Sequence, residues 1–165
     1  MKINTTPILN HTVTELAFSG SLPEDFPCGV TVTSSTVTGK IKNAAGYMTL
    51  TADISINYTQ PCDRCLVDTE YSLEFALSAP VAVVGALEED DDDYLFVKGD
   101  TLDITGRLAE EIYIHLPERH LCHEECRGLC QECGADMNKT DQAECGCTPK
   151  KIDAKWEKIK LMLDE

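Results

Sequence analysis

Cysteine is the residue type in this sequence whose spacing points most directly to chemistry. Eight of the nine cysteines fall into four close pairs. In chain order the pairs are Cys62 and Cys65, Cys122 and Cys126, Cys130 and Cys133, and Cys145 and Cys147. A structural zinc ion takes four thiolate or imidazole ligands in a tetrahedron, and a short spacing brings two ligands together at little cost in loop entropy. Four such pairs predict two four-cysteine sites and therefore two zinc ions per chain.

The order of the pairs indicates which of them share an ion. The third and fourth pairs are separated by a short polar loop and can close one site locally. The first pair has no neighbour in sequence and is left with the second pair, which requires the chain to return to an earlier β-hairpin. The two predicted ligand sets are Cys130, Cys133, Cys145 and Cys147 for the first site, and Cys62, Cys65, Cys122 and Cys126 for the second.

Three other uses of the cysteines compete with zinc. A disulfide framework is disfavoured because the number of cysteines is odd and the N-terminus lacks the apolar run of an export signal. A thioredoxin-like redox site needs a helix after its Cys-x-x-Cys, whereas residues 69–77 have the period of a strand. An iron–sulfur cluster also takes four thiolates and remains open as an alternative.

Nothing in the sequence indicates a catalytic centre. There is no Gly-x-Ser-x-Gly, no phosphate-binding glycine-rich loop and no His-Glu-x-x-His, and four thiolates leave no open position on zinc. We expect His115, His120 and His123 to be exposed surface residues, with His123 the alternate ligand. The lone Cys28 is typical of a small buried thiol. The expectation is a protein that is not an enzyme and has no small-molecule substrate.

The elements that must position these cysteines follow from hydrophobic periodicity. Residues 49–58 and 70–77 alternate between apolar and polar side chains, and a Thr/Val-rich run covers residues 30–41. Residues 42–46 have the composition of a turn. We predict an α+β fold in which an antiparallel β-sheet or partial barrel, solvated on one face, packs against a helix.

Two domains are expected, 1–117 and 118–165. In the first, an acidic loop over 86–100 contains six consecutive carboxylates, and a helix over 103–116 ends at Pro117. An apolar stripe on this helix, suited to packing on the sheet, consists of Ile104, Leu108, Ile112 and Leu116.

The second domain is predicted to be a Cys-rich, zinc ribbon-like module followed by a short C-terminal helix near residues 153–163. Trp156 shares a face of that helix with other apolar residues and is expected to anchor the tail. The candidate contacts to RNA or to a partner are four lysines: Lys150, Lys151, Lys155 and Lys158. A solvated helix face is the other interpretation of these lysines.

The charge of the chain limits its partners. The formal net charge is −15, which repels phosphate backbones at long range and favours basic proteins. No stretch has the roughly 20 apolar residues that a membrane-spanning helix needs, and we expect a cytoplasmic protein without membrane contact.

Several motifs together resemble the DUF177 family, also called the YceD family. They are Cys62-Asp-Arg-Cys65-Leu, Leu102-Asp-Ile-Thr, Leu116-Pro117, Cys126-Arg-Gly-Leu-Cys130, and the ending Asp153-Ala-Lys-Trp156. The ending departs from the family's pattern at Ala154 and Lys155. The resemblance implies a role in accumulation or processing of large-subunit ribosomal RNA. The expected partners are the rRNA precursor, a basic ribosomal protein, or both.

Two functional hypotheses follow. The first is a non-catalytic zinc-binding factor in large ribosomal subunit biogenesis. The alternative is a metal or redox protein: a zinc reservoir, an iron–sulfur carrier or a thiol switch. Metal content and a visible absorption spectrum distinguish the two.

Overall fold

The protein is built on one nearly closed sheet of seven strands, seen in a computed structural model that describes residues 1–85, 93–139 and 145–147. The spatial order of the strands is β1-β7-β6-β5-β4-β3-β2. Their bounds are Lys2–Asn4 (β1), Glu15–Gly20 (β2), Thr31–Ala44 (β3), Tyr47–Pro61 (β4), Asp68–Val83 (β5), Leu95–Lys98 (β6) and Thr101–Asp103 (β7). Within these described ranges two short helices accompany the sheet, α1 (Thr6–Leu9) and α2 (Thr105–His115).

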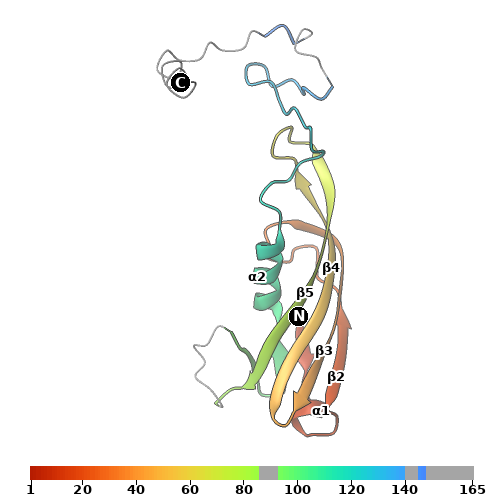
Figure 1. Ribbon diagram of the computed structural model, residues 1–165, viewed down its shortest axis with the longest axis vertical. Coiled ribbons are helices and arrows are strands. Elements are labelled where there is room, and N and C mark those ends of the chain that lie inside the picture. The colour runs from red at the N-terminus through yellow and green to blue at the C-terminus, as the bar shows by residue number, and fades with distance from the viewer. Residues whose placement is uncertain (86–92, 140–144, 148–165) are drawn as a thin grey trace, which may run out of the picture.

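The three long strands β3, β4 and β5 form an antiparallel meander that dominates the molecule (Figure 1). The turn between β3 and β4 contains Ala45 and Gly46, both with positive φ, as a tight hairpin requires. One strand pair departs from the predicted antiparallel arrangement, since β5 and β6 run parallel, with Val81 opposite Leu95. The fold is therefore more strand-rich than predicted, and its sheet is mixed.

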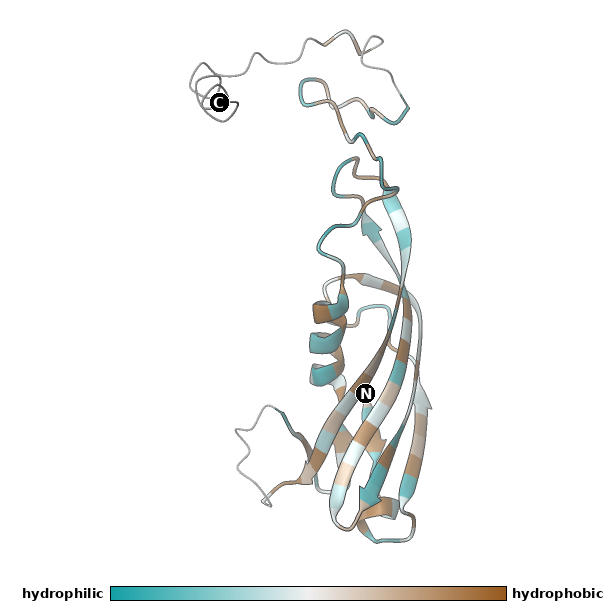
Figure 2. Cartoon of the chain, in the orientation of Figure 1, coloured by the Kyte–Doolittle hydropathy of each residue, from teal (hydrophilic) through white to brown (hydrophobic). Residues whose placement is uncertain are grey.

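The period-two pattern of β4 is confirmed. Apolar side chains of this strand are buried in the core, and the residues between them are exposed or half-buried. The matching alternation of hydrophobic and hydrophilic residues along the strands is visible in Figure 2. The buried set on β4 is Met48, Leu50, Ala52, Ile54, Ile56 and Tyr58. Burial of this face is the main source of stability for the sheet.

Helix α2 lies against β5 and carries two fully buried residues, Leu108 and Ile112, into the same core. At its C-terminal end the His115 ring stacks on Phe75 of β5, with 4.4 Å between ring centroids. Leu116 is already extended because the following Pro117 disfavours the helical conformation. The chain thus leaves α2 toward the end of β5 that carries the cysteine hairpin.

Short elements were not predicted. They are α1, β1, β2 and β7, together with β6, which occupies residues 95–98 of the predicted acidic loop. Residues 86–92, most of the acidic run, lie outside the described residues, and so does the predicted tail helix at 153–163. No helix in the described ranges is long and apolar enough to cross a bilayer.

Candidate metal centres

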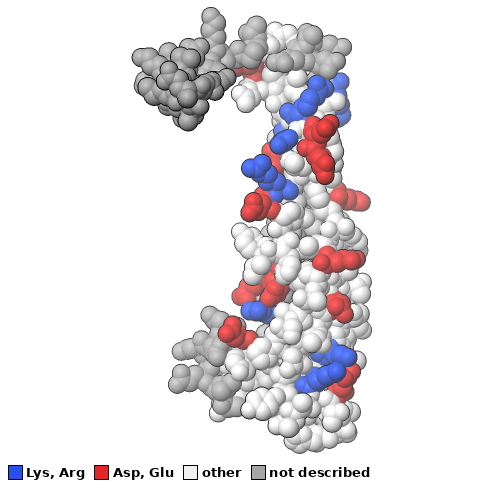
Figure 3. Space-filling model, viewed as in Figure 1, with Lys and Arg blue, Asp and Glu red and all other residues white. Residues whose placement is uncertain are grey.

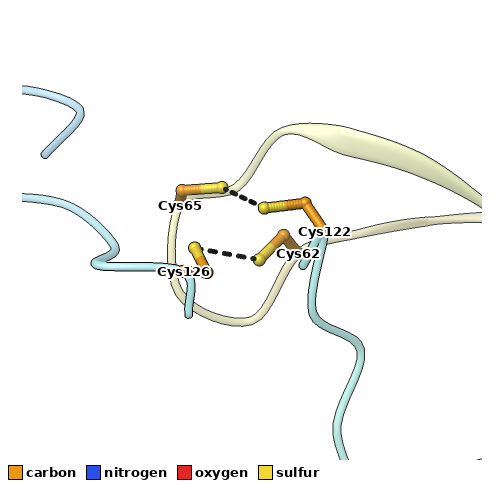
Figure 4. A group of neighbouring side chains, drawn as sticks. All are labelled: Cys62, Cys65, Cys122 and Cys126. Carbon is orange, nitrogen blue, oxygen red and sulfur yellow. Dashed lines mark hydrogen bonds between the residues drawn. The ribbon is translucent and has the colours of Figure 1, made fainter. Parts of the chain in front are cut away.

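The connection between β4 and β5 is a tight turn that presents two cysteines. The Leu66 N–H donates to the Cys62 carbonyl at 2.9 Å, and the Cys62 N–H donates to the Val67 carbonyl at 2.9 Å. These bonds curl the backbone so that the Cys62 and Cys65 side chains lie on one side of the turn (Figure 4). Both cysteines are buried, although they stand at the end of the longest hairpin.

Two further cysteines, from the segment after α2, complete a cluster with this turn. We call this cluster the hairpin centre; it consists of Cys62, Cys65, Cys122 and Cys126, whose sulfur atoms all lie within 4.8 Å of one another. The Cys62 and Cys126 sulfurs are 3.8 Å apart, and those of Cys65 and Cys122 are 3.6 Å apart. The structure thus brings together the four residues of the predicted cross-domain site.

Backbone and side-chain hydrogen bonds hold this segment on the hairpin tip. The Asp63 N–H donates to the His120 carbonyl at 2.8 Å, and the His120 N–H donates back to the Asp63 carboxylate at 2.7 Å. Arg64 donates its Nη1 to the Cys126 carbonyl at 2.7 Å and accepts the Leu129 N–H on its own carbonyl at 3.1 Å. Hydrogen bonds of the surrounding polypeptide therefore set the positions of the four thiols.

Gly128 makes the close approach of the two segments possible. Its φ is +74°, and a Cβ at this position would lie 2.9 Å from the Arg64 carbonyl oxygen. Any side chain would therefore push the segment away from the turn and disturb the neighbouring Cys126.

A second cluster lies further along the chain. We call it the loop centre; it consists of Cys130, Cys133, Cys145 and Cys147, again with all sulfur atoms within 4.8 Å. The Cys145 sulfur is 3.4 Å from those of both Cys130 and Cys133. The Gly134 N–H donates to the Cys130 carbonyl at 2.9 Å, which repeats the turn formed by Cys62 and Leu66. These are the four residues predicted for the local site.

The sulfur–sulfur distances suit a tetrahedral ion. Zinc–sulfur bonds of about 2.3 Å place the four sulfurs of a tetrahedron about 3.8 Å apart. The distances between 3.4 and 3.8 Å in the two clusters are close to that edge. A disulfide needs about 2.05 Å, and all nine cysteines are free. The donor set therefore fits a thiophilic metal ion in each centre.

The electrostatics of the hairpin centre also favour a cation. Burial alone would raise the pKa of the Cys62 thiol, but the backbone N–H groups of Arg64, Cys65 and Cys122 outweigh it and lower the pKa to about 6. Burial and the neighbouring thiols of Cys126 and Cys65 raise the pKa of Cys122 to about 12. Cys62 is thus ready to ionise, while Cys122 is held neutral by its surroundings. A divalent cation would stabilise the thiolate form of all four cysteines together.

The loop centre repeats this pattern with less burial. Backbone N–H groups of Cys133 and Glu132 lower the pKa of Cys130 to about 6. The neighbouring thiols of Cys145 and Cys133 raise the pKa of Cys147 to about 12. Both centres therefore combine a preorganised thiolate with thiols that repel further negative charge.

The histidines differ in their exposure and in their contacts. His120, expected at the surface, is 9% exposed and donates or accepts a hydrogen bond with the Tyr58 hydroxyl at 3.1 Å, so this expectation was wrong. His123 is exposed and places Nδ1 3.1 Å from the Cys122 sulfur, beside the hairpin centre. Cys28 is buried as expected, with its thiol 3.8 Å from the Val30 carbonyl.

Other expected site residues lie outside the described residues, and some important ones were missed. The four candidate lysines, Lys150, Lys151, Lys155 and Lys158, belong to the part that is not described. The missed residues are Asp63 and Arg64, which hold the segment carrying Cys126, and Asn138, whose amide Nδ2 lies 3.4 Å from the Cys126 sulfur. The position of Asp63 and Arg64 inside a Cys-x-x-Cys was a usable signal, whereas nothing in the sequence marks Asn138.

The fold and the two clusters define the class of protein: a strand-rich chain whose hairpin tip and C-terminal loop each gather four thiols suited to a metal ion. A family model described as large ribosomal RNA subunit accumulation protein YceD matches residues 50–163. The chain belongs to this family, as its motifs indicated.

Curated relatives are distant. An uncharacterized protein of Mycobacterium tuberculosis is 23% identical over 127 residues, which cover 75% of this chain and 59% of that protein. YlbN of Bacillus subtilis, also uncharacterized, is 35% identical over 65 residues, covering 39% of this chain and 38% of YlbN. A chloroplastic large ribosomal RNA subunit accumulation protein YCED homolog 1 of Zea mays is 32% identical over 51 residues, covering 31% of this chain and 17% of its own length.

The chain thus spans about half the length of the mycobacterial relatives that it matches. No solved structure matches it significantly.

Proposed function

We propose that this protein is a non-catalytic zinc-binding factor that supports the accumulation of large-subunit ribosomal RNA. The observation that carries the proposal is the match to the YceD family over residues 50–163, a span that contains all eight paired cysteines. The description of the family supports the role in rRNA accumulation, and the two thiol clusters support the metal.

A structural use of zinc agrees with the donor set. Four thiolates fill a tetrahedral ion and leave no position for a water nucleophile. Zinc in the hairpin centre would be held by Cys62 and Cys65 of the hairpin and by Cys122 and Cys126 of the following segment, and so would cross-link two parts of the chain. The sulfur spacing favours a single ion over an iron–sulfur cluster, because a cluster inserts several atoms between its cysteines.

Charge supports a role in binding rather than in catalysis. A chain with a net charge of −15 attracts basic proteins, and the ribosome is rich in them. We propose that the partner is a basic ribosomal protein, the rRNA precursor, or both, and that the protein works in the cytoplasm. The tail lysines at 150, 151, 155 and 158 are the proposed RNA contacts.

A complementation experiment tests the function. Cells lacking the protein should accumulate less mature large-subunit rRNA relative to small-subunit rRNA, and the wild-type gene should restore the ratio. Genes carrying Cys62→Ser or Cys130→Ser should fail to restore it, whereas Cys28→Ser, which alters the lone cysteine, should succeed. An unchanged rRNA ratio in cells without the protein would disprove the proposal.

Metal analysis of the purified protein separates zinc from the redox alternative. We expect about two zinc ions per chain and no visible absorption, since zinc has no redox or d-electron transitions. Visible charge-transfer bands, or thiols that cycle between oxidised and reduced forms without loss of structure, would instead favour an iron–sulfur carrier or a thiol switch.

A further inference from the structure

Leu66, at the tip of the β4–β5 hairpin, has a backbone conformation that disfavours its side chain. Its φ is +60°, in the left-handed region that is uncommon for bulky residues. The equivalent turn in the loop centre has Gly134 at this position, with φ of +74° and the same hydrogen bond back to the first cysteine. The chain therefore contains two turns of the same form, one with an unstrained glycine at the left-handed position and one with a leucine there.

Burial does not explain the leucine. The Leu66 side chain is 66% exposed and the adjacent Val67 is 43% exposed. The apolar residues that pack on the hairpin centre are others, Leu121 and Leu129. A strained position that carries an exposed apolar side chain is a reason to infer function, because strain persists where the side chain is needed.

An acidic surface continues from this tip along the hairpin. The outer face of β5 presents Asp68, Glu70 and Glu74, two or four residues apart and thus on the same side of the strand. Across the ladder, Ser55 of β4 lies opposite Glu74. A hollow of about 440 Å³ on this face is lined in part by Asp53, Ser55 and Glu74.

Neither strand carries a lysine or arginine along this stretch, residues 53–61 of β4 and 68–76 of β5. Figure 3 shows acidic side chains spaced along the elongated body, with Lys and Arg side chains gathered near its upper and lower ends. Arg64 in the turn itself directs its guanidinium inward to the Cys126 carbonyl, 2.7 Å away. The outward-facing surface is therefore an apolar tip followed by a row of carboxylates.

We propose that this surface binds a lysine- and arginine-rich segment of a protein, with an apolar side chain of the partner on Leu66 and Val67 and its basic side chains on Asp68, Glu70 and Glu74. The proposal rests on the function proposed above and specifies the partner class. A protein fits better than RNA, because carboxylates repel phosphates and aliphatic side chains offer no ring on which bases stack. The glycine that the backbone favours is replaced by leucine because the partner contacts that leucine.

The test compares the zinc-loaded full chain with its Leu66→Gly variant. The first probe is the RNA-free protein mixture extracted from large ribosomal subunits, with bound proteins identified by mass, and the second is a large-subunit rRNA transcript. We expect the wild-type chain to bind at least one basic ribosomal protein and Leu66→Gly to bind it about tenfold more weakly or worse. Zinc content and thermal midpoint should not fall in Leu66→Gly, because glycine suits the positive φ.

A matched control and a charge variant sharpen the result. Tyr47→Ser alters another exposed apolar residue, 83% exposed, at the opposite end of β4, and should bind as the wild type does. The double variant Glu70→Lys and Glu74→Lys should weaken binding, and added salt should weaken wild-type binding. A photo-crosslinking residue at position 66 should attach to the same ribosomal protein.

Several outcomes would overturn the inference. They are equal binding of the ribosomal protein by wild type and Leu66→Gly, absence of any bound basic protein, and crosslinking from position 66 to the transcript instead. These failures are separable from failure of the proposed function. If Leu66→Gly restores rRNA accumulation in cells as fully as wild type does, the surface is not needed while the function stands.

Discussion

The side-chain amide of Asn138 donates a hydrogen bond to the sulfur of Cys126, with 3.4 Å between Nδ2 and Sγ. Asn138 lies between Cys133 and Cys145, the inner cysteines of the loop centre, but its amide serves the hairpin centre. Its Oδ1 also accepts the Arg127 N–H at 2.8 Å. The two centres are therefore structurally connected, because a residue of one loop stabilises a ligand of the other.

Replacing Asn138 should weaken zinc binding in the hairpin centre. Partners that donate hydrogen bonds to metal ligands contribute roughly 10- to 100-fold to metal affinity, and we expect Asn138→Ala to lose about this much. Competition with a chelator measures the affinity. Asn57→Ala is the matched control, since the Asn57 amide donates to the Ser34 hydroxyl on the sheet, at 2.9 Å, rather than to a cysteine sulfur. Equal zinc affinity in the Asn138→Ala variant and wild type would contradict the assigned contact.

Single cysteine replacements should remove one ion each but differ in their effect on stability. Cys130→Ser should reduce zinc from about two ions to about one per chain and unfold the loop centre, because metal binding energy there is folding energy. Cys62→Ser should also remove one ion and, in addition, lower the thermal midpoint of the sheet, since the hairpin centre closes the β4–β5 ladder. Metal analysis and thermal unfolding check both, and unchanged zinc content in Cys130→Ser would show that the ligand assignment is wrong.

The pKa values of the thiols predict how many protons zinc displaces. At about pH 8, Cys62 and Cys130, each with a pKa of about 6, are already ionised, whereas Cys122 and Cys147, each with a pKa of about 12, still carry protons. Zinc should therefore release fewer than four protons per centre. As the pH falls through 6, the two low-pKa thiols of the zinc-free chain take up protons, so the release per ion should rise while the affinity falls.

Calorimetry in buffers with different ionisation enthalpies measures this proton release. A release that stays constant across this pH range, or an affinity that rises as the pH falls, would contradict the thiol pKa values.

The long strands and the cysteine clusters could be predicted because their signals are local. Alternation along β4 indicates which face of the strand is buried, and the spacing of each cysteine pair indicates a turn. Both signals lie within a few consecutive residues. The assignment of Cys62 and Cys65 to the later pair Cys122 and Cys126 came by elimination, and the structure brings these four sulfurs together.

The rest depends on contacts between distant parts of the chain. Strand β1 exists because Ile3 lies opposite Leu102 of β7, and neither segment alone is long enough to show a period. His120 is buried because it meets Tyr58, 62 residues earlier, and its own neighbours in sequence do not indicate burial. The left-handed conformation of Leu66 could not be predicted either, because residue preference at that position favours glycine.

The aromatic cluster beside the hairpin centre offers a matched pair of conservative changes. Tyr58 and Tyr71 stack with 5.5 Å between ring centroids, and both rings pack edge-on against His120. The Tyr58 hydroxyl bonds to the His120 ring, whereas the buried Tyr71 hydroxyl has no partner within the described residues. Removal of the two hydroxyls should therefore change the free energy of unfolding by different amounts.

We expect Tyr58→Phe to lower the free energy of unfolding by about 1–3 kcal/mol, because it leaves a buried nitrogen of His120 without a hydrogen bond. Tyr71→Phe should be neutral or stabilising, since it removes a buried hydroxyl that gains no bond in the folded state. For a chain of this size, each kcal/mol corresponds to a shift in thermal midpoint of roughly 2–4 °C, so scanning calorimetry resolves the difference. A larger loss of stability in Tyr71→Phe than in Tyr58→Phe would show that the hydrogen bond to His120 does not stabilise the hairpin tip.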